Sequence, residues 1–392
     1  MMIDLTRGVT AAAGFEAAGV VAGIKASGAA DLALVVNRGP RFDAVAVFTS
    51  NRFVAAPVTW SRQAVQDGCL KAVVLNSGGA NACTGPAGLA DCEQTARWAA
   101  AALGCSADDV AVCSTGLIGE RLPLAAVERG VGRAKDALAD DDQAGLAAAT
   151  AIMTTDTRPK QASYTSPAGW TVGGMAKGAG MLAPSLATLL VVVTTDAVID
   201  STDFEPALWA ATAVSFDRAD SDGCMSTNDT VLALASGASG TAPDPDEFAQ
   251  ALAEVCVSLA RQLIADAEGA DHEITITVSR AASEEDAVEV ARAVARSALF
   301  KCAVAGNDPN WGRVVAAVGT TAAQFDPDRV DIAFNGVTVF RQGGLGEPRS
   351  AVDLSGRQVA VDIDLHAGHH AATLWTTDLT HAYVSENSDY SS

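Results

Sequence analysis

The sequence predicts a layered α/β protein, of the α+β kind, rather than a doubly wound parallel sheet. Short, valine-rich apolar runs mix with longer segments of helical periodicity, and the two kinds do not alternate strictly. Hydrophobic residues make up 49% of the 392 residues and charged residues 19%, which allows a sizeable core. Because aromatic residues contribute 5%, we expect that core to pack through small side chains.

Strands are expected where short apolar runs end at turn residues. The predicted strands cover residues 32–36, 44–48, 73–75, 110–113, 170–175, 189–193, 231–234, 274–278, 314–318, 330–334, 359–365 and 372–376. Helices are expected where apolar residues recur every three or four positions. The predicted helices begin at Pro123 and cover 85–102, 145–153, 203–214, 246–265 and 284–298. The sequence shows no internal repeat and no low-complexity linker, and its length suits either two lobes or one large layered unit.

The formal net charge is −21, from 47 acidic against 26 basic residues. Such a charge repels polyanions, so nucleic acid and anionic membrane surfaces are poor candidate partners. Segment 1–7 lacks the pattern of a secretory signal, and Lys25 and Asp31 interrupt the most apolar N-terminal run. We therefore expect a soluble cytoplasmic protein that neither spans a membrane nor binds nucleic acid.

Neither the cysteines nor the histidines have the spacing of a metal site. The eight cysteines form no C-x-x-C pair and stand among alanine, valine and leucine, which predicts buried, reduced thiols. His366, His369 and His370 lie close together without a further set of ligands. We expect them to form a turn between two strands, and we predict no metal.

The glycine-rich segment 173–184 allows three functional interpretations. A phosphate-binding loop would place Ser or Thr after a Gly-Lys pair, whereas here Lys177 precedes Gly178. A dinucleotide-binding turn would open a long helix, whereas an apolar strand follows. The third interpretation is a processing site, in which the segment leads to Ala187 and Thr188 just before that strand.

Thr188 could carry covalent chemistry if the chain is cut before it. Its hydroxyl can attack the preceding carbonyl group, and hydrolysis of the ester then frees an N-terminal threonine. An α-amino group has a pKa of about 8, against about 10.4 for lysine, so it can act as a base near neutral pH. Threonines that begin buried strands are nevertheless common, and from the residues alone an ordinary strand start is the more frequent explanation.

Several blocks of sequence point to one family. They are Asn-Ser-Gly-Gly-Ala-Asn-Ala-Cys-Thr-Gly at 76–85, Ser-Thr-Gly-Leu-Ile-Gly at 114–119, Met-Thr-Thr-Asp-Thr at 153–157, Lys-Gly-Ala-Gly-Met-Leu-Ala-Pro-Ser-Leu-Ala-Thr-Leu-Leu at 177–190, Gly-Asn-Asp-Pro-Asn-Trp-Gly-Arg at 306–313, and the tail 383–392. In this order they resemble the bacterial ornithine acetyltransferases, also called glutamate N-acetyltransferases. The resemblance covers nearly the whole chain. Its departures are Ser185-Leu186 in place of Asn-Met, Asp271-His272-Glu273 after the family's Glu-Gly-Ala, and a C-terminus without threonines.

The resemblance implies a set of site residues. Thr188 is the implied nucleophile, and the protein itself cuts the Ala187–Thr188 bond. The implied oxyanion hole consists of the Thr115 hydroxyl and the Gly116 N–H, two donors that can stabilise a tetrahedral oxyanion. The implied substrate-binding residues are Thr154, Lys177, Thr188, Glu268, Asn387 and Ser392.

Each of these roles has an ordinary alternative. We expect Lys177 to pair with the substrate α-carboxylate and Glu268 to meet a cationic or amide nitrogen. Glu268 could equally be a solvated carboxylate at a helix end, and Asn387 and Ser392 could belong to a loose terminus. His272 is the only histidine near one of the blocks, and a site role for it stays open.

The resemblance also implies a fold and a reaction. The fold is an αββα-type sandwich reminiscent of the N-terminal-nucleophile hydrolases. Self-cleavage gives an α chain, 1–187, and a β chain, 188–392, which form one intertwined fold and commonly an α2β2 assembly. N-acetylornithine acetylates Thr188, ornithine leaves, and glutamate then takes the acetyl group in a ping-pong reaction without metal or other cofactor. Some members also accept acetyl-CoA, and the sequence leaves this question open.

Three other functions fit parts of the sequence. A self-cleaving aminopeptidase or amidohydrolase of related fold would resolve the acyl-enzyme with water. A binding protein could have kept the fold without the activity, and a paralogue could serve a secondary-metabolite gene cluster. Lys177, Glu268 and the tail favour the acetyltransferase over the hydrolase, because they offer groups to hold an amino-acid acceptor.

Overall fold

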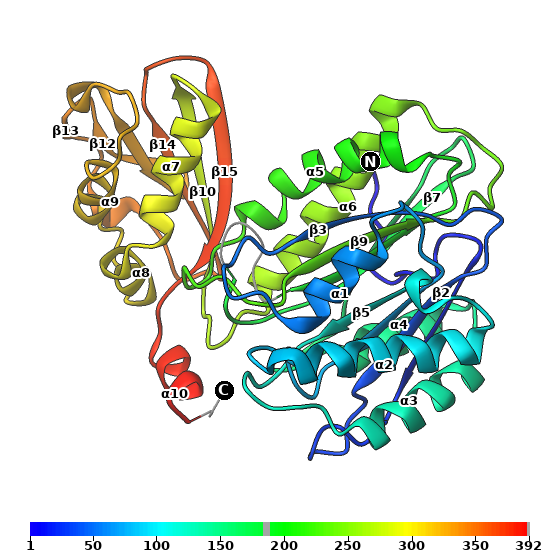
Figure 1. The fold of residues 1–392 in the computed structure, drawn as a ribbon. Helices are drawn as coiled ribbons and strands as arrows, with labels where there is room; N and C mark the ends of the chain where they lie inside the picture. Colours follow the sequence, from blue (N-terminus) through cyan, green and yellow to red (C-terminus); the bar gives the residue numbers. More distant parts are fainter. Residues whose placement is uncertain (183–188, 390–392) are drawn as a thin grey trace. The chain divides into compact units, whose positions relative to one another are not determined.

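The structure is a computed structural model that describes residues 1–182 and 189–389 (Figure 1). Three residues to which the sequence analysis assigns roles, Ala187, Thr188 and Ser392, lie outside the described residues. The chain divides into two compact units. Unit 1 contains residues 1–217 and 224–263, and unit 2 contains the described residues of 218–223 and from 264 onward.

The described residues of unit 1 form two sheets flanked by helices. Its strands are β1 (Phe15–Val20), β2 (Leu32–Asn37), β3 (Asp43–Phe48), β4 (Ala72–Asn76), β5 (Val110–Ser114), β6 (Lys160–Thr165), β7 (Thr171–Lys177), β8 (Leu190–Thr195) and β9 (Thr230–Ala235). The first sheet has the order β1-β2-β4-β5, and the second has the order β3-β9-β8-β7-β6. The pairs β4–β5 and β8–β9 are parallel, and the other neighbours are antiparallel.

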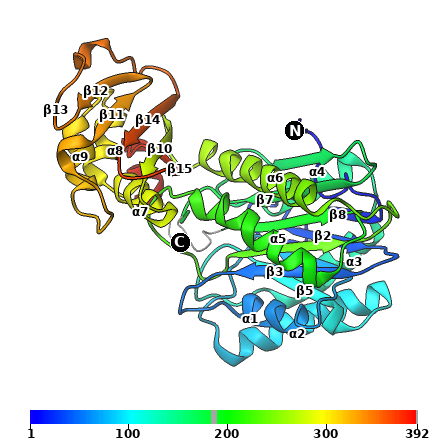
Figure 2. The ribbon, with the colours of Figure 1, turned by 90° about the horizontal axis from the view of Figure 1, so that it is seen from above.

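Helices pack against both sheets in unit 1. They are α1 (Ala56–Ala64), α2 (Gly85–Leu103), α3 (Leu124–Asp136), α4 (Asp142–Ala151), α5 (Ser201–Ala213) and α6 (Pro245–Ala265). Helices α2 and α3 lie on the first sheet, and α5 and α6 lie on the second (Figures 1 and 2). This helix–sheet–sheet–helix order is the αββα sandwich that the family resemblance implied.

The layers explain why the strands of unit 1 are apolar on both faces. Successive side chains of a strand point to opposite faces of the sheet. On β2, Ala33 and Val35 belong to the core between the two sheets, whereas Leu32 and Leu34 pack with α2 and α3. Both faces of each sheet are therefore buried, and this accounts for the short continuous apolar runs in the sequence.

Unit 2 has one six-stranded sheet, with the order β13-β12-β11-β14-β10-β15. Its strands are β10 (Glu273–Ala281), β11 (Asp331–Phe334), β12 (Val337–Arg341), β13 (Gly344–Leu345), β14 (Gln358–Asp364) and β15 (His370–Thr377), and its helices are α7 (Glu284–Ala295), α8 (Ala298–Ala305), α9 (Trp311–Val318) and α10 (His381–Asp389). A core separate from that of unit 1 joins this sheet to α7, α8 and α9.

Two predictions about elements in unit 2 are wrong. Residues 314–318 were expected as a strand but belong to α9, where the Asn310 side chain caps the helix by accepting from the Arg313 N–H at 3.2 Å. The aromatic ring of Trp311 stacks on Phe340 of β12 at 4.9 Å and holds this helix against the sheet. Residues 381–389, for which no helix was predicted, form the helix α10.

The prediction that all eight cysteines are buried is also wrong. Cys92, Cys113 and Cys256 are buried, whereas Cys83, Cys224 and Cys302 are exposed. Burial raises the pKa of Cys92 and of Cys256 to about 12, so these thiols stay protonated at neutral pH.

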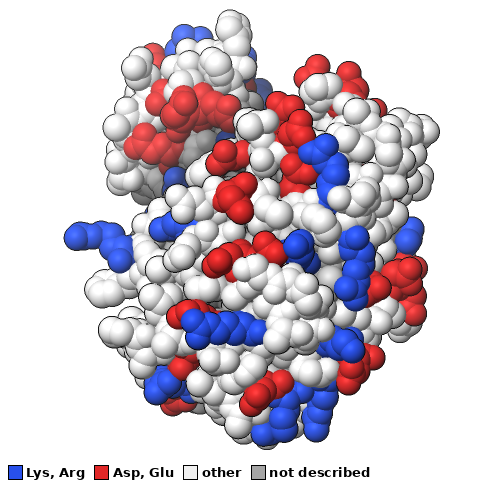
Figure 3. Space-filling model, turned by 45° about the vertical axis from the view of Figure 1, so that its right-hand side comes forward, with Lys and Arg blue, Asp and Glu red and all other residues white. Residues whose placement is uncertain are grey.

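The surface and the longest helix bear on the membrane question. On the face drawn in Figure 3, Lys and Arg side chains lie among Asp and Glu side chains, in keeping with the net charge of −21. Helix α6 is long and apolar enough to cross a membrane by length and composition alone. Phe248, Leu252 and Leu259 of this helix are buried on one face within the protein. That pattern is typical of a core helix of a globular protein.

Candidate active site

The carboxyl ends of two parallel strands place the predicted oxyanion residues. The last residues of β4 and β5, Asn76 and Ser114, are paired in register, and the Ser114 hydroxyl donates to Asn76 Oδ1 at 2.6 Å. The N–H of Thr115 donates to the Asn76 carbonyl at 3.0 Å. The turn that begins at Thr115 is therefore fixed by the sheet before any substrate is bound.

Gly116 occupies a position that other residues cannot fill without strain. Its φ is +130°, and a Cβ atom there would lie 2.7 Å from the main-chain nitrogen of Gly79. Within residues 1–182 and 189–389, the Gly116 N–H donates no hydrogen bond. The unpaired Gly116 N–H and the neighbouring Thr115 hydroxyl are two donors of the kind that an oxyanion hole needs.

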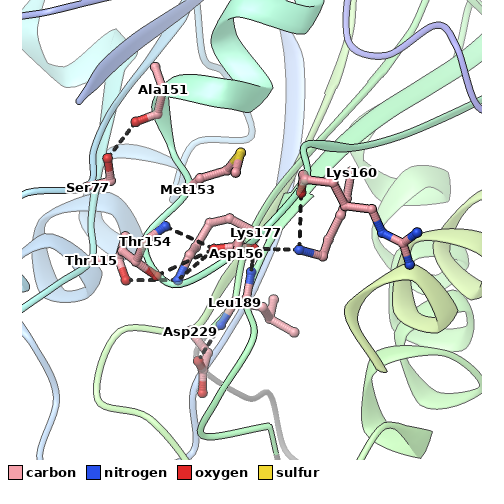
Figure 4. A network of polar contacts seen from close by, with 12 residues as sticks. Ser77, Thr115, Ala151, Met153, Thr154, Asp156, Lys160, Lys177, Leu189 and Asp229 are labelled. Carbon is pink, nitrogen blue, oxygen red and sulfur yellow. Dashed lines mark hydrogen bonds and ion pairs between the residues drawn. The ribbon is translucent and has the colours of Figure 1, made fainter. Parts of the chain in front are cut away.

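Lys177, the last residue of β7, lies next to this turn (Figure 4). The residue is 1% exposed, and Nζ donates to Thr115 Oγ1 at 3.3 Å. Because Thr115 Oγ1 accepts this bond, the hydroxyl hydrogen can donate to another acceptor. Lys177 thus supports Thr115 as a donor and brings a positive charge to the same place.

Asp156 is the centre of the polar network in Figure 4. Its Oδ1 accepts from Lys160 Nζ at 2.6 Å and from the Gly178 N–H at 2.7 Å. Its Oδ2 accepts from the Thr154 N–H at 2.9 Å and lies 4.0 Å from Lys177 Nζ. One carboxylate therefore connects two of the predicted substrate-binding residues, Thr154 and Lys177.

Asp156 is ionised in this network. Burial on its own raises the pKa of a carboxyl group, but the charges of Lys177 and Lys160 outweigh this effect and hold the pKa of Asp156 below its usual value. Both Asp156 and Lys160 have fully buried side chains. Since unpaired buried charges are costly, the carboxylate and the lysines depend on one another.

A third lysine, Lys25, fixes the loop that carries Thr154. Nζ of the half-buried Lys25 donates to the Met153 carbonyl at 2.6 Å and to the Ala30 carbonyl at 3.1 Å. The hydroxyl of Ser77 donates to the Ala151 carbonyl at 2.5 Å. The loop after α4 is thereby held against the first sheet, with Thr154 half-buried at its start.

Asn228 and Asp229 connect the start of β8 to the oxyanion turn. The Asn228 side-chain amide donates to the Ser114 carbonyl at 2.8 Å, on the residue before Thr115. Asp229 Oδ1 accepts from the N–H of Leu189 at 3.1 Å, two residues after the predicted cleavage point (Figure 4). Asp229 is completely buried, and burial raises its pKa well above the usual range.

The remaining predicted residues lie in unit 2. Glu268 is half-buried, and its Oε2 accepts from the Asn387 side-chain amide at 3.1 Å. The turn after Glu268 needs a glycine, because Gly269 has a φ of +59° and a Cβ there would lie 2.1 Å from the Tyr383 nitrogen. Helix α10 is thus docked on this turn, which brings Asn387 and Glu268 together.

Two of the histidines, His272 and His366, make structural contacts. Nδ1 of the buried His272 lies 2.7 Å from Asp378 Oδ2, and Nε2 lies 3.0 Å from the Leu354 carbonyl. These contacts occupy both ring nitrogens, so they leave no nitrogen for a substrate. His366 pairs with Asp331 at 2.9 Å. Within the described parts of the chain, no group of three or more His, Cys, Asp or Glu side chains could hold a metal ion.

Two aspartates of the site, Asp156 and Asp229, were not predicted from the sequence. Asp156 stands inside the block 153–157, where the resemblance assigned a role to Thr154 and none to its neighbour. Asp229 stands in no motif, and its sequence neighbours give no hint of complete burial. Only the pairing of β9 with β8 brings Asp229 beside Leu189.

Comparisons with known proteins agree on one family. The sequence profile of the ArgJ family matches residues 16–392. The chain is 61% identical over 383 residues to the arginine biosynthesis bifunctional protein ArgJ of Thermobifida fusca, covering 98% of this chain and 99% of that protein. It is 59% identical to the Streptomyces coelicolor protein of the same name, covering 98% and 100%. A crystal structure of ornithine acetyltransferase complexed with ornithine, from Mycobacterium tuberculosis, is 55% identical and covers 48% of this chain and 99% of that one, with a TM-score of 0.47.

Proposed function

Because the chain belongs to the ArgJ family of arginine-biosynthesis acyltransferases, we propose that it transfers an acetyl group from N2-acetyl-L-ornithine to L-glutamate. The observation that carries this proposal is the identity of 61% over nearly the whole length of a relative named arginine biosynthesis bifunctional protein ArgJ. The cluster of Thr115, Gly116 and Lys177 supports it, because it offers two oxyanion donors and a cation in unit 1.

The first step of the proposal is self-cleavage between Ala187 and Thr188. The Thr188 hydroxyl attacks the Ala187 carbonyl carbon, the peptide C–N bond breaks, and water hydrolyses the resulting ester. This leaves an α chain, 1–187, and a β chain, 188–392, with a free amine on Thr188. The chemistry is consistent with the position of the cut, directly before the buried strand β8.

The second step is acyl transfer through Thr188. The amine takes the hydroxyl proton while Oγ bonds to the acetyl carbon, and the Thr115 hydroxyl and Gly116 N–H stabilise the oxyanion. The tetrahedral intermediate collapses when the nitrogen of ornithine leaves with that proton. Glutamate then attacks the acetyl ester by the reverse sequence and restores the Thr188 hydroxyl. This chemistry requires no metal, nucleotide or prosthetic group.

Substrate binding is assigned by the family resemblance. Lys177 pairs with the α-carboxylate of the amino acid, and Thr154 adds a hydroxyl beside it. Glu268, Asn387 and Ser392 hold the remainder of the donor or acceptor. The hydrogen bond between Asn387 and Glu268 supports a joint role for these two side chains.

A second activity is favoured by the name of the relatives. The proteins of Thermobifida fusca and Streptomyces coelicolor are both described as bifunctional. We propose that this chain also accepts acetyl-CoA as acetyl donor for glutamate. The enzyme acts in the cytoplasm as an α2β2 assembly of cleaved chains.

The mass of the purified protein tests cleavage and acetylation together. Incubation with N-acetylornithine should add one acetyl group to the fragment 188–392, and added glutamate should remove it. With both substrates varied, initial-rate plots should give parallel lines. A self-cleaving aminopeptidase or amidohydrolase would instead lose the acetyl group to water at the same rate with and without glutamate. An intact chain that takes up no acetyl group would identify a binding protein.

A further inference from the structure

Lys25 lies in the loop between β1 and β2, and this loop is wound around the carboxylate of Asp31. Asp31 Oδ1 accepts from the Ala22 N–H at 2.6 Å. Asp31 Oδ2 accepts from three further N–H groups, those of Gly23 at 3.2 Å, Ile24 at 2.6 Å and Lys25 at 2.8 Å. Because Asp31 is completely buried, these four bonds fix the backbone from which the Lys25 side chain extends.

The Lys25 side chain reaches the peptide group between Met153 and Thr154. Its Nζ donates to the carbonyl oxygen of this peptide group, that of Met153, at 2.6 Å. The N–H of the same peptide group, that of Thr154, donates to Asp156 Oδ2 at 2.9 Å (Figure 4). Since a peptide group is planar, an ammonium on its oxygen and a carboxylate on its N–H together fix the orientation of its plane.

Charge strengthens both of these hydrogen bonds. A hydrogen bond to an ionised group is roughly twice as strong as one between neutral groups. Asp156 is ionised, and the Lys25 ammonium interacts with two carboxylates: burial lowers the pKa of Lys25, and the charges of Asp31 and Asp156 act against this effect. The peptide group before Thr154 is therefore held between a positive and a negative group, in the direction that its own dipole favours.

The orientation of this peptide group decides where the Thr154 hydroxyl lies. Thr154 Oγ1 is 3.5 Å from Asp156 Oδ2, the oxygen that also holds the Thr154 N–H. The same oxygen lies 4.0 Å from Lys177 Nζ. A rotation of the peptide group would change the backbone of Thr154 and carry its hydroxyl away from this oxygen and from Lys177.

We propose that Lys25 is a positioning residue for substrate binding: through the peptide group before Thr154, it sets where the Thr154 hydroxyl meets the substrate. This inference rests on the proposed function, in which Thr154 binds the amino-acid substrate, and it adds a residue that acts through Thr154. The end of α4 does not depend on Lys25, because the Ser77 hydroxyl holds the Ala151 carbonyl at 2.5 Å. Loss of Lys25 should therefore loosen Thr154 and leave α4 in place.

The test compares the KM for N-acetylornithine with the rate of self-cleavage. Lys25→Met keeps an unbranched side chain and removes the donor. Its KM should rise about tenfold, the effect of one lost hydrogen bond, while kcat stays unchanged, because a contact made equally before and in the transition state affects KM alone. Self-cleavage should keep the wild-type rate, since it takes place without substrate. Lys25→Arg keeps a cationic donor and should restore most of the wild-type KM.

A double variant shows whether Lys25 acts through Thr154. Thr154→Val should raise the KM at least as much as Lys25→Met does, because it removes the hydroxyl itself. Adding Lys25→Met to Thr154→Val should raise the KM no further, since the effects of two residues that act through one contact do not add. Independent effects would instead multiply, to about 100-fold.

Lys71 provides a matched control at the far end of β4. It is also a half-buried lysine of unit 1, and its Nζ lies 3.0 Å from Asp109 Oδ2. It directly precedes β4, whose last residue, Asn76, carries the oxyanion turn. Lys71→Met should leave the KM, kcat and the rate of self-cleavage at their wild-type values.

Three results would overturn the proposal. The first is a wild-type KM in Lys25→Met. The second is a loss of self-cleavage in Lys25→Met as large as its loss of transfer, which would make Lys25 part of the fold. The third is a KM in the double variant that equals the product of the two single effects, which would mean that Lys25 acts without Thr154.

Failure of the proposed function looks different in the same experiments. A wild-type protein that is cleaved but never acetylated refutes the proposed function, and the inference with it. A wild type that transfers acetyl groups, together with a Thr154→Val variant of unchanged KM, refutes the binding role of Thr154 and the inference, but not the reaction.

Discussion

At the scale of single residues, the site of unit 1 is built on charge pairs that depend on one another. The side chains of Lys160 and Asp156 are fully buried, with Lys160 Nζ 2.6 Å from Asp156 Oδ1. Lys177 Nζ lies 4.0 Å from the other oxygen of this carboxylate and donates to Thr115 Oγ1. Such a network holds its side chains in place, because removing one charged group would leave another buried charge without a partner. Thr115 is the point at which this network meets the predicted oxyanion.

Replacing Thr115 by valine should slow catalysis while the fold is kept. Valine has the shape of threonine without the hydroxyl, and loss of one oxyanion donor costs about 10²–10³ in kcat. Self-cleavage should slow as well, because it passes through the same kind of intermediate. The half-time of cleavage and the rate of acetyl transfer measure the two effects. Thr115→Ser, which keeps the donor, is the control, and a valine variant of wild-type rate would refute the oxyanion role.

Replacing Asp156 by asparagine should destabilise the protein in a pH-dependent way. The folded-state pKa of Asp156 lies below the value of about 3.9 expected in an unfolded chain. Its ionisation therefore stabilises the fold above that pH, and this contribution is lost as the pH falls through the folded-state pKa. At pH 7, Asp156→Asn should lower the free energy of unfolding by about 3–5 kcal/mol, because Lys160 loses its buried partner.

Urea unfolding at pH 7 and pH 3 measures this difference, which should be smaller at pH 3. The control is Asp142→Asn, which removes a carboxylate paired with Arg7 at the protein surface and should change the stability little at either pH. Equal stability of Asp156→Asn and the wild type at pH 7 would show that the buried lysines do not need this carboxylate.

At the scale of elements, the sequence predicted most strands and helices but not every one. Strands buried on both faces, such as β2 and β8, gave clear apolar runs. The run 314–318 looks the same in sequence, yet it forms part of α9, because a short apolar run does not distinguish a strand from a buried helix. The cap by Asn310 and the stacking of Trp311 on Phe340 decide the outcome.

The site residues that stand in sequence motifs could be predicted. A residue that reaches the site only through the pairing of strands could not. Thr115, Gly116 and Lys177 stand in recognisable blocks, and the structure brings Lys177 and Thr115 together. Asp229 has no such signal, because its role depends on complete burial and on the parallel pairing of β8 with β9. Pairing between strands separated by a long helical segment cannot be inferred from periodicity within either strand.

Helix α10 is the element on which substrate binding by the tail can be tested. Truncation of residues 387–392 removes Asn387 but keeps the contacts by which the helix docks, including the hydrogen bond that the Thr380 hydroxyl donates to the Gly269 carbonyl. Acetyl transfer should fall more than self-cleavage, since cleavage needs Thr188 and its oxyanion donors. Both rates are measured on the same preparation.

A second variant separates docking from binding. Gly269→Ala places a Cβ 2.1 Å from the Tyr383 nitrogen and should displace the whole helix. It should then reduce transfer at least as much as truncation does. If cleavage and transfer fall together in the truncated protein, the tail is a folding element and its substrate role is wrong.

At the scale of the whole molecule, the predicted cut falls inside unit 1 and not between the two units. The α chain, 1–187, would contribute β3, β6 and β7 to the second sheet, and the β chain, 188–392, would contribute β8 and β9. The sheet order places the β-chain strands between β3 and β7, with antiparallel ladders on both sides. The two chains are therefore parts of one core.

This arrangement predicts that the two fragments stay together after cleavage. Purified protein should give two masses, corresponding to 1–187 and 188–392, with Thr188 as the new N-terminus, whereas Thr188→Ala should remain one inactive chain. Without denaturant, both fragments should elute together, because separation would break the β3–β9 and β7–β8 ladders and expose the core between the sheets. Urea should separate them in the same transition that unfolds unit 1. Fragments that part in native buffer would contradict the shared sheet, and a different N-terminus would contradict Thr188 as the nucleophile.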